Sequence, residues 1–403
     1  MSRSIIFRCL LLAIAFLPFS LTKAQIPTRI IVNEGFERPD LNATCGIPGS
    51  GFDQIDQSAV QGWLTTAPSQ GGLSCGPANG SPIEIWSDGF LSVPAFEGNQ
   101  FAEVNAESVA RLYQEVCLTA NESVNYQYYH RARAQANETT RASLHDAAGA
   151  LVFNGPLDAV SLGDGWVQHS GALTNDAVAG ARQFSFESLS PASPVGNFID
   201  NITVDLRPLV EIQLNTMSPA SGSEDSVGSM EFALIISGTL DSDAVFNLTL
   251  DAASSASPQL DYSVAVGALA GRGEVNSFNS GSGEIQITLP AGEYDPNQTN
   301  NSLNQQGVIV LPLSISADAI YEGDETIVYN LGSIQSGGGS TADKNLEFND
   351  STCNGTIVSQ VMGTIVDDEP VPPRQVPTIG VWGQLFLSLL MPLVVFFRRR
   401  KLV

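Results

Sequence analysis

The sequence predicts an all-β protein with two antiparallel sandwiches in series and a single C-terminal transmembrane helix. Short segments with apolar and polar residues in alternation recur along the chain, for example residues 123–129 and 197–204. Turn-forming residues separate these segments about every ten positions, and no long amphipathic helical pattern competes with them. About 350 residues lie between the two ends of the chain, a length that favours about two domains.

Residues 1–24 have the pattern of a secretory signal peptide. Arg3 and Arg8 supply a positive start, residues 9–17 form a short apolar run, and Ala24 is a small residue at the expected cleavage site. A buried helix of a globular domain is the alternative interpretation. The position at the extreme N-terminus favours export.

Residues 379–397 contain nineteen consecutive uncharged positions, a length sufficient to span a bilayer as one helix. The tail at 398–403 begins with Arg398-Arg399-Arg400-Lys401, and such a basic cluster stays on the cytoplasmic side. We therefore expect everything upstream to lie outside the membrane.

A Pro-rich linker at 371–378 runs into the sequence Val376-Pro377-Thr378-Ile379-Gly380-Val381-Trp382-Gly383. This motif, the apolar segment and the basic tail together resemble the IPTL-type C-terminal sorting signal of Gram-negative bacteria. The resemblance implies a protein of the cell envelope or outer surface that is a substrate for a sorting protease of the exosortase type.

The composition is acidic, with a net charge of −24. Repulsion between such a chain and a polyanion argues against a nucleic-acid partner. Four cysteines remain once Cys9 leaves with the signal, and an exported protein meets an oxidising environment. We expect a disulfide between Cys45 and Cys75, which both lie in Gly- and Pro-rich loops, and leave the pairing of Cys117 and Cys353 open.

The first domain, residues 25–207, carries a series of short motifs in a fixed order. They are Asn33-Glu34-Gly35-Phe36-Glu37, Gln61-Gly62-Trp63, Ile83-Glu84-Ile85-Trp86, a Glu97-to-Ala106 stretch and Leu112-Tyr113-Gln114. This series resembles the galactose-binding-like jelly rolls of bacterial and plant surface proteins. The resemblance implies carbohydrate binding, or a structural Ca²⁺ held between the first and last strands by Glu37 and Asp200. The alternative is that these two carboxylates are separate surface residues.

Aromatic rings can stack on the apolar face of a sugar, so Trp63, Trp86 and Tyr113 are candidate ligand contacts, with Arg131 as a polar one. Each aromatic also lies in a strand-like motif, where a large ring more often belongs to the core. A solvated sheet face explains Arg131 equally well.

The second domain, residues 208–370, contains twenty-two Asp and Glu and only Arg272 and Lys344 as basic residues. Several strands with one apolar face each predict a sandwich. Acidic patches at 223–226, 318–325 and 366–369 follow or precede these strands. Oxygen-rich clusters without His or Cys are typical of Ca²⁺ sites.

These acidic patches, with Leu260-Asp261-Tyr262, resemble the Calx-beta domain, an immunoglobulin-like sandwich that binds Ca²⁺. Position by position, the resemblance implies carboxylate ligands and one backbone carbonyl, that of Ile320. The carboxylates are Glu224, Asp261, Asp318, Glu322, Glu325, Asp367, Asp368 and Glu369. Ala317 stands where the family places an Asp, which predicts weak, extracellular-type binding. The alternative is diffuse cation binding by acidic loops.

Nothing in the sequence indicates an enzyme. Only His130, His145 and His169 occur, none at metal-ligand spacing, and no nucleophile or metalloprotease motif is present. We therefore expect a surface-anchored, calcium-binding adhesion or extracellular-matrix protein with a glycan or another surface protein as partner. The alternative is a carbohydrate-binding module displayed on a structural stalk.

Overall fold

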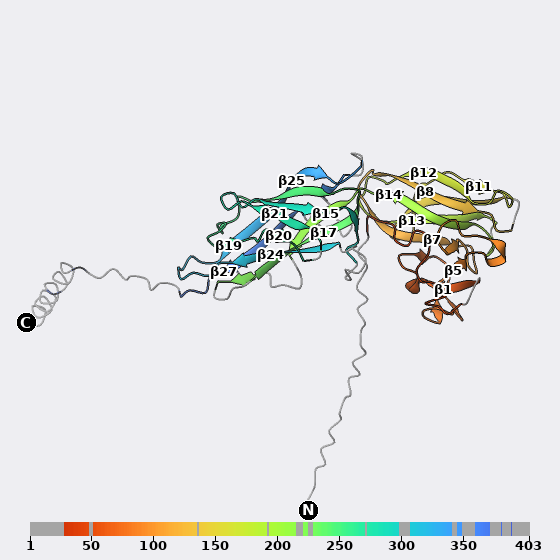
Figure 1. The fold of residues 1–403 in the computed structure, drawn as a ribbon, viewed down its shortest axis with the longest axis horizontal. Coiled ribbons are helices and arrows are strands. Elements are labelled where there is room, and N and C mark those ends of the chain that lie inside the picture. The colour runs from red at the N-terminus through yellow and green to blue at the C-terminus, as the bar shows by residue number, and fades with distance from the viewer. Residues whose placement is uncertain are drawn as a thin grey trace, which may run out of the picture.

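The computed structural model describes residues 28–47, 51–134, 137–191, 193–214, 221–224, 229–270, 272–297, 307–340, 345–348 and 359–370, together with Gly380 and Ser388. The chain folds into two β-sandwiches that lie next to each other (Figure 1). The prediction of an all-β sandwich protein is confirmed for this part of the chain.

The first sandwich consists of two six-stranded sheets. One sheet has the order β1 (Phe52–Asp56), β5 (Pro82–Ser87), β6 (Gln100–Glu103), β14 (Phe198–Asp205), β8 (Ser123–Arg131) and β12 (Val167–Thr174). The other has the order β10 (Leu151–Asn154), β9 (Glu138–Asp146), β13 (Gly180–Ser190), β7 (Arg111–Leu118) and β2 (Leu64–Thr65), with β11 (Asp158–Val160) paired to β9. A small hairpin of β3 (Gln70–Gly71) and β4 (Asn79–Gly80) and two 3₁₀ turns, Gln57–Ala59 and Phe90–Ser92, complete it.

The core of the first sandwich lies between these sheets because alternate residues of each strand point inward. On β13, Phe186 packs on Tyr128 of β8 and Phe184 packs on Tyr126 of the same strand, while Trp63 packs on Phe36 and Phe186. The disulfide between Cys45 and Cys75 is present, as predicted. Cys117 is disulfide-bonded as well, and Cys353 lies outside the described residues.

The second sandwich also has two sheets. One has the order β19 (Tyr262–Ser263), β24 (Val308–Ile315), β17 (Ser229–Leu240), β15 (Leu209–Leu214) and β26 (Glu347–Phe348), with β23 (Gly292–Tyr294) paired to β17. The other has the order β16 (Ser221–Ser223), β27 (Gln360–Val366), β25 (Glu325–Gly337), β18 (Ala244–Leu250), β22 (Ile285–Leu289), β21 (Glu274–Phe278) and β20 (Gly267–Ala268). The alternating residues of β17, β22 and β24 are buried in one core.

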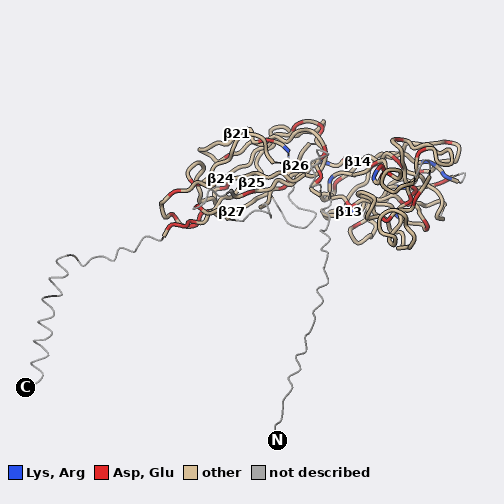
Figure 2. Tube along the Cα trace, turned by 60° about the horizontal axis from the view of Figure 1, so that its bottom comes forward, with Lys and Arg blue, Asp and Glu red and all other residues tan. Residues whose placement is uncertain are grey.

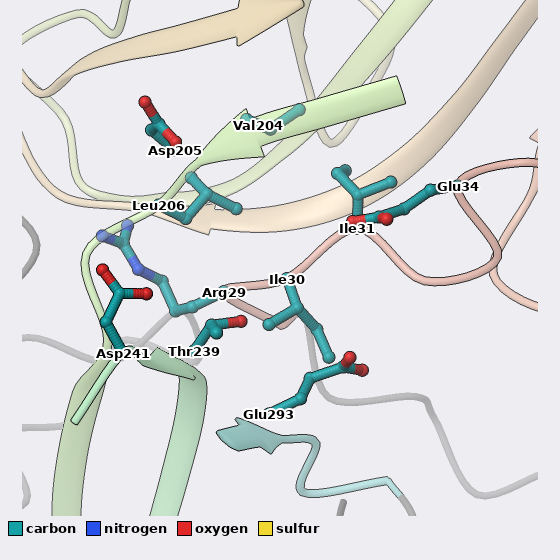
Figure 3. Close-up of a pocket in the computed structure, with 10 residues that line it drawn as sticks. All are labelled: Arg29, Ile30, Ile31, Glu34, Val204, Asp205, Leu206, Thr239, Asp241 and Glu293. Carbon is teal, nitrogen blue, oxygen red and sulfur yellow. The ribbon is translucent and has the colours of Figure 1, made fainter. Parts of the chain in front are cut away.

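Arg29 joins the two sandwiches. Its backbone N–H donates to Ser237 Oγ of the second sandwich at 2.6 Å, and its guanidinium forms two 2.6 Å contacts with the Glu122 carboxylate of the first. Burial alone would raise the pKa of Glu122, but the hydrogen bonds and charge of Arg29 hold it below its ordinary value. A cavity of about 170 Å³ lies beside Arg29 between the sandwiches, with Glu34 and Glu293 on its wall (Figure 3).

Among the described residues, no helix has the length and apolarity needed to cross a membrane. The predicted signal peptide at 1–24 and the predicted cytoplasmic tail at 398–403 lie outside the described residues. So does the predicted transmembrane segment at 379–397, apart from Gly380 and Ser388.

Candidate functional site

Strand ends and loops at one end of the second sandwich bring the predicted acidic residues together. Glu224 follows β16, Asp261 precedes β19, Glu325 begins β25, and 367–369 follow β27. Figure 2 shows these acidic loops at the end of the second sandwich that lies away from the first. We call this region the acidic pole and define it by the eight predicted carboxylate residues.

Two groups of three carboxylates form within the acidic pole. Glu224, Asp368 and Glu369 make one group, and Asp261, Glu322 and Glu325 make the other. In each group the three oxygen atoms lie within 4.8 Å of one another. The parallel pairing of β16 with β27 creates the first group, because Ser223 pairs with Val366 and both strands end at the same level.

Asp318 and Asp367 shape the loops around these two groups. Asp367 accepts hydrogen bonds from the backbone N–H groups of Glu322, at 2.7 Å, and Gly323. Asp318 accepts one from the N–H of Ile320, also at 2.7 Å. Gly323 has a φ of +82°, a conformation that a glycine adopts without strain. These contacts hold the loop of 318–324 against the residues that follow β27.

The carboxylates of the acidic pole are incompletely satisfied. Glu224 is 5% exposed, and its Oε2 atom is buried without a hydrogen-bond partner. The Oε2 atoms of Glu325 and Glu369 are in the same condition. Burial raises the pKa of Glu224 to about 7, and the charges of Asp367, Asp318, Glu369 and Glu322 add to the rise. Burial and Asp261 raise the pKa of Glu325 in the same way.

Unpartnered carboxylate oxygens in close groups fit a hard cation. Ca²⁺ takes six to eight oxygen ligands in a flexible shell, and a cation removes the mutual repulsion of the carboxylates. The residues of the pole supply only oxygen, which disfavours metals that prefer nitrogen or sulfur. The donor set therefore fits Ca²⁺ and would hold it through the two groups.

The weaker candidate pair, Glu37 and Asp200, also lies close together. A Cβ atom on Gly35 would lie 3.5 Å from Asp200 Oδ1 and 3.9 Å from Glu37 Cγ. Glu37 accepts from the N–H groups of Asn99 and Gln100, whereas Asp200 accepts from three other backbone N–H groups. Burial raises the pKa of Asp200 to about 7. Backbone N–H groups of the segment 96–100 donate to both carboxylates, so the positioning of this segment explains the pair without a metal.

Trp63 and Trp86 do not face a ligand. Trp63 is completely buried and Trp86 is 1% exposed, so neither ring offers a surface for stacking. Trp63 donates from Nε1 to the carbonyl of Asn33, and Trp86 donates to Glu84. The core alternative was therefore correct for both tryptophans. Arg131 is half-buried at the end of β8, in the sheet opposite Tyr113.

Tyr113 lies on the outer face of the sheet β10-β9-β13-β7-β2, among polar residues. Rows of paired positions cross this face: Tyr113 pairs with Ser185, which pairs with Ser143, and Gln183 pairs with His145. The neighbouring inward positions, such as Leu112, Leu144, Phe184 and Phe186, belong to the core. We call these five outward residues, with Arg111, Arg141 and Glu187, the polar face.

Hydrogen bonds link most of the polar face. Ser185 Oγ lies 3.0 Å from Ser143 Oγ and 3.1 Å from His145 Nδ1, while Arg141 donates twice to Glu187. The Arg111 guanidinium lies 5.9 Å from the centre of the Tyr113 ring. Two buried atoms here have no partner, Arg111 Nη1 and Gln183 Oε1. The face therefore combines the half-buried Tyr113 ring with an unused donor and an unused acceptor that are themselves buried, beside the buried side chains of Ser143, Ser185 and His145.

Two clusters of titratable side chains could not be predicted from the sequence, because strands that are far apart in the chain bring their residues together. His130 and His169 lie with ring centres 5.6 Å apart in the first sandwich, and each has one buried nitrogen without a partner. Burial lowers the pKa of His130 to about 4. Glu84 and Glu103 form a second cluster under Arg133, which contacts both carboxylates. No spacing along the chain could have indicated either one.

Comparisons with known proteins give no family and no curated relative, because no family model and no curated protein matches the chain. Among solved structures, the chain resembles the CBM22-1 xylan-binding domain from Paenibacillus barcinonensis Xyn10C, at 15% identity and a TM-score of 0.26, over 39% of this chain and 92% of that one. It also resembles TmCBM61 in complex with β-1,4-galactotriose, at 13% identity and a TM-score of 0.26, over 44% and 98%. The apo-form Calx CBD1 domain matches at 14% identity and a TM-score of 0.23, over 40% and 99%.

Proposed function

We propose that this chain is an exported, non-catalytic surface protein that binds glycan through its first sandwich and Ca²⁺ through its second. The observation that carries glycan binding is the polar face, where the Tyr113 ring lies beside donors and acceptors. Sugars present both an apolar ring face and hydroxyl groups that donate and accept. A site with one accessible aromatic ring and several convergent polar groups suits such a ligand.

Each part of the polar face has a role in this proposal. Tyr113 stacks against a sugar ring, with Arg111 holding the phenol ring from one side. Arg111 Nη1 and Gln183 Oε1 are buried without a partner, so Arg111 Nη1 donates to a sugar hydroxyl and Gln183 Oε1 accepts from one once the side chains at the edge of the face turn aside. Ser143, Ser185 and His145 form a hydrogen-bonded floor that keeps these groups in place.

Glycan-array screening of the full chain in detergent, followed by calorimetry with the best oligosaccharide, tests this proposal. Tyr113→Ala should weaken binding by about tenfold, or about 1.4 kcal/mol, with the thermal midpoint preserved. Tyr321→Ala removes an accessible tyrosine from the second sandwich and serves as the matched control. Equal binding by wild type and Tyr113→Ala, or no glycan bound at all, would overturn the assignment of this face.

A second function is favoured by one specific observation, the buried Glu224 oxygen without a partner. We propose that the acidic pole holds Ca²⁺ between its two carboxylate groups and that the ion stiffens the loops. Ca²⁺ should then raise the thermal midpoint of the second sandwich, and EGTA should reverse the rise. Glu224→Gln should abolish most of the effect, whereas Glu274→Gln, at an exposed position of β21, should keep it. An unchanged midpoint with Ca²⁺ argues against a cation site.

The sequence features at the two ends complete the proposal. The signal at 1–24 exports the chain, and the apolar segment at 379–397 holds it at the membrane until a sorting protease of the exosortase type acts. Membrane fractionation of cells that express the full chain or a Trp382→Ala variant tests this part. Recovery of the full chain only in a soluble cytoplasmic fraction would contradict it.

A further inference from the structure

Apolar side chains are exposed at the acidic pole, next to the carboxylates. Leu260 is 71% exposed, Ile320 61% and Tyr321 42%. Leu260 directly precedes Asp261, and Tyr321 directly precedes Glu322. Because Asp261 and Glu322 belong to the same carboxylate group, the three apolar residues border that group.

We propose that the acidic pole, once it holds Ca²⁺, docks onto the surface of a phospholipid bilayer. The bound ion takes phosphate oxygens of the lipid headgroups, while the side chains of Leu260, Ile320 and Tyr321 enter the headgroup layer. This inference rests on the cation site of the proposed function and adds a partner to it.

Coordination numbers leave room for lipid oxygens. Each carboxylate group offers three residues with one oxygen atom apiece within mutual reach, whereas Ca²⁺ takes six to eight ligands. The remaining positions require oxygen atoms from carbonyls, water or an external anion. The buried and unpartnered Oε2 atom of Glu224 indicates that the pole itself is short of a cation. Phosphate oxygens are hard ligands that complete such a shell.

The charge of the acidic pole makes this docking depend on bound Ca²⁺. Without a cation the eight carboxylates of the pole repel the phosphate layer of a bilayer, and the exposed apolar side chains alone are too few to overcome this repulsion. Ca²⁺ neutralises the carboxylates and attracts phosphate. Apolar side chains that enter the interface then add binding energy in proportion to the apolar area that they bury.

The acidic pole also lies close in sequence to the predicted membrane segment. β27 ends at Val366, Asp367 to Glu369 follow, and only residues 371–378 precede the apolar segment at 379–397. Eight residues span at most about 28 Å when fully extended. The acidic pole is therefore the part of the folded protein that the chain itself keeps nearest to a bilayer. The first sandwich lies at the opposite end of the second (Figure 2).

Fluorescence quenching on the full chain tests the docking. The Tyr321→Trp variant is reconstituted into nanodiscs of phosphatidylcholine and phosphatidylserine with brominated or unbrominated acyl chains. Ca²⁺ should quench the emission that this substitution adds by about twofold in brominated discs, because an interfacial side chain lies at the boundary of the acyl chains. EGTA should restore the emission. Leu157→Trp, at a position of the first sandwich that is 66% exposed, is the matched control and should show no quenching.

Tb³⁺ luminescence in the same samples tests the cation site separately from the membrane docking. Luminescence that Ca²⁺ displaces, together with no Ca²⁺-dependent quenching, overturns the docking and leaves the cation site standing. No Tb³⁺ binding overturns both. Leu260→Ser in the Tyr321→Trp background should reduce quenching while leaving Tb³⁺ luminescence unchanged, and equal losses of both signals would also contradict the docking.

Discussion

Glu84 on β5 and Glu103 on β6 pair at the same register position, and their carboxyl groups share a hydrogen bond. Burial raises the pKa of Glu103 to about 10, the charge of Glu84 adds to the rise, and Arg133 opposes it. We therefore predict that Glu103 carries the shared proton at neutral pH. The folded protein binds this proton more tightly than the unfolded chain does.

Stability should consequently fall as the pH rises. The folded pKa of Glu103 lies above the ordinary value of 4.5, so its stabilising contribution is complete below about pH 4.5 and is lost towards pH 10. The loss is at most about 1.4 kcal/mol per pH unit. In the Glu103→Gln variant the amide group still donates a hydrogen bond to Glu84, but it has no proton that titrates. Its thermal midpoint should exceed that of the wild type at pH 9 and approach it at pH 5.

Glu115→Gln provides the control for this experiment, because Glu115 lies on the solvent side of β7. Its midpoint should follow the wild-type pH profile. A Glu103→Gln variant whose stability falls with pH as steeply as that of the wild type would show that Glu103 does not hold the shared proton.

Ca²⁺ binding at the acidic pole should weaken as the pH falls. Burial raises the pKa of Glu224 to about 7, so protons compete with the cation at and below neutral pH. Without Ca²⁺, the raised pKa makes the pole more stable at pH 5 than at pH 8. We expect the midpoint rise caused by Ca²⁺ to be larger at pH 8 than at pH 5. Calorimetric titrations at both pH values should show about a tenfold difference in affinity or more, and equal affinities would exclude Glu224 as a ligand.

Replacement of Arg29 should destabilise the protein strongly. Arg29→Met leaves the Glu122 carboxylate, whose side chain is 13% exposed, without its cation. Such a change in a buried pair costs about 3–5 kcal/mol. Chemical denaturation measures the loss, and Arg29→Met/Glu122→Met should recover much of it because no charge is left unpaired. Arg38→Met removes an exposed arginine that contacts Gln61 and should cost less than about 0.5 kcal/mol.

Loss of the disulfide between Cys45 and Cys75 should lower the free energy of unfolding by about 3 kcal/mol, because it closes a separation of 30 residues in the unfolded chain. The Cys45→Ser/Cys75→Ser variant, compared with the wild type in urea, measures this contribution. A shift below about 1 kcal/mol would mean that neighbouring packing alone holds the two loops together.

Alternation along single strands allowed most of the second sandwich to be predicted. The residues Met230, Phe232, Leu234 and Ile236 form one buried row of β17 because a strand places every second residue on the same face. The acidic residues at the strand ends were also predicted, through the Calx-beta resemblance, and six of the eight form the two groups.

Contacts between neighbouring strands could not be predicted from the sequence. The row of Tyr113, Ser185 and Ser143 depends on the register of three strands that are far apart in the chain. Likewise, local alternation cannot decide between the core and a ligand face for Trp86, because residues on both sides of β5 are buried. When both faces of a strand are buried, the apolar face no longer differs from a polar, exposed one. The sequence then cannot indicate which face a side chain such as Trp86 occupies.

The parallel pairing of β16 with β27 has a mechanical consequence for a protein held at one end. The chain enters the second sandwich at β15, continues into β16 and leaves after β27. Tension that passes beyond β15 therefore pulls the parallel neighbours β16 and β27 in opposite directions along their axes. Their hydrogen bonds then bear the load together in shear. Glu224 and Asp368 lie where the two strands end, and an ion held between them would connect both strands under that load. If the acidic pole binds Ca²⁺ as proposed, single-molecule stretching should give a higher rupture force in Ca²⁺ than in EGTA.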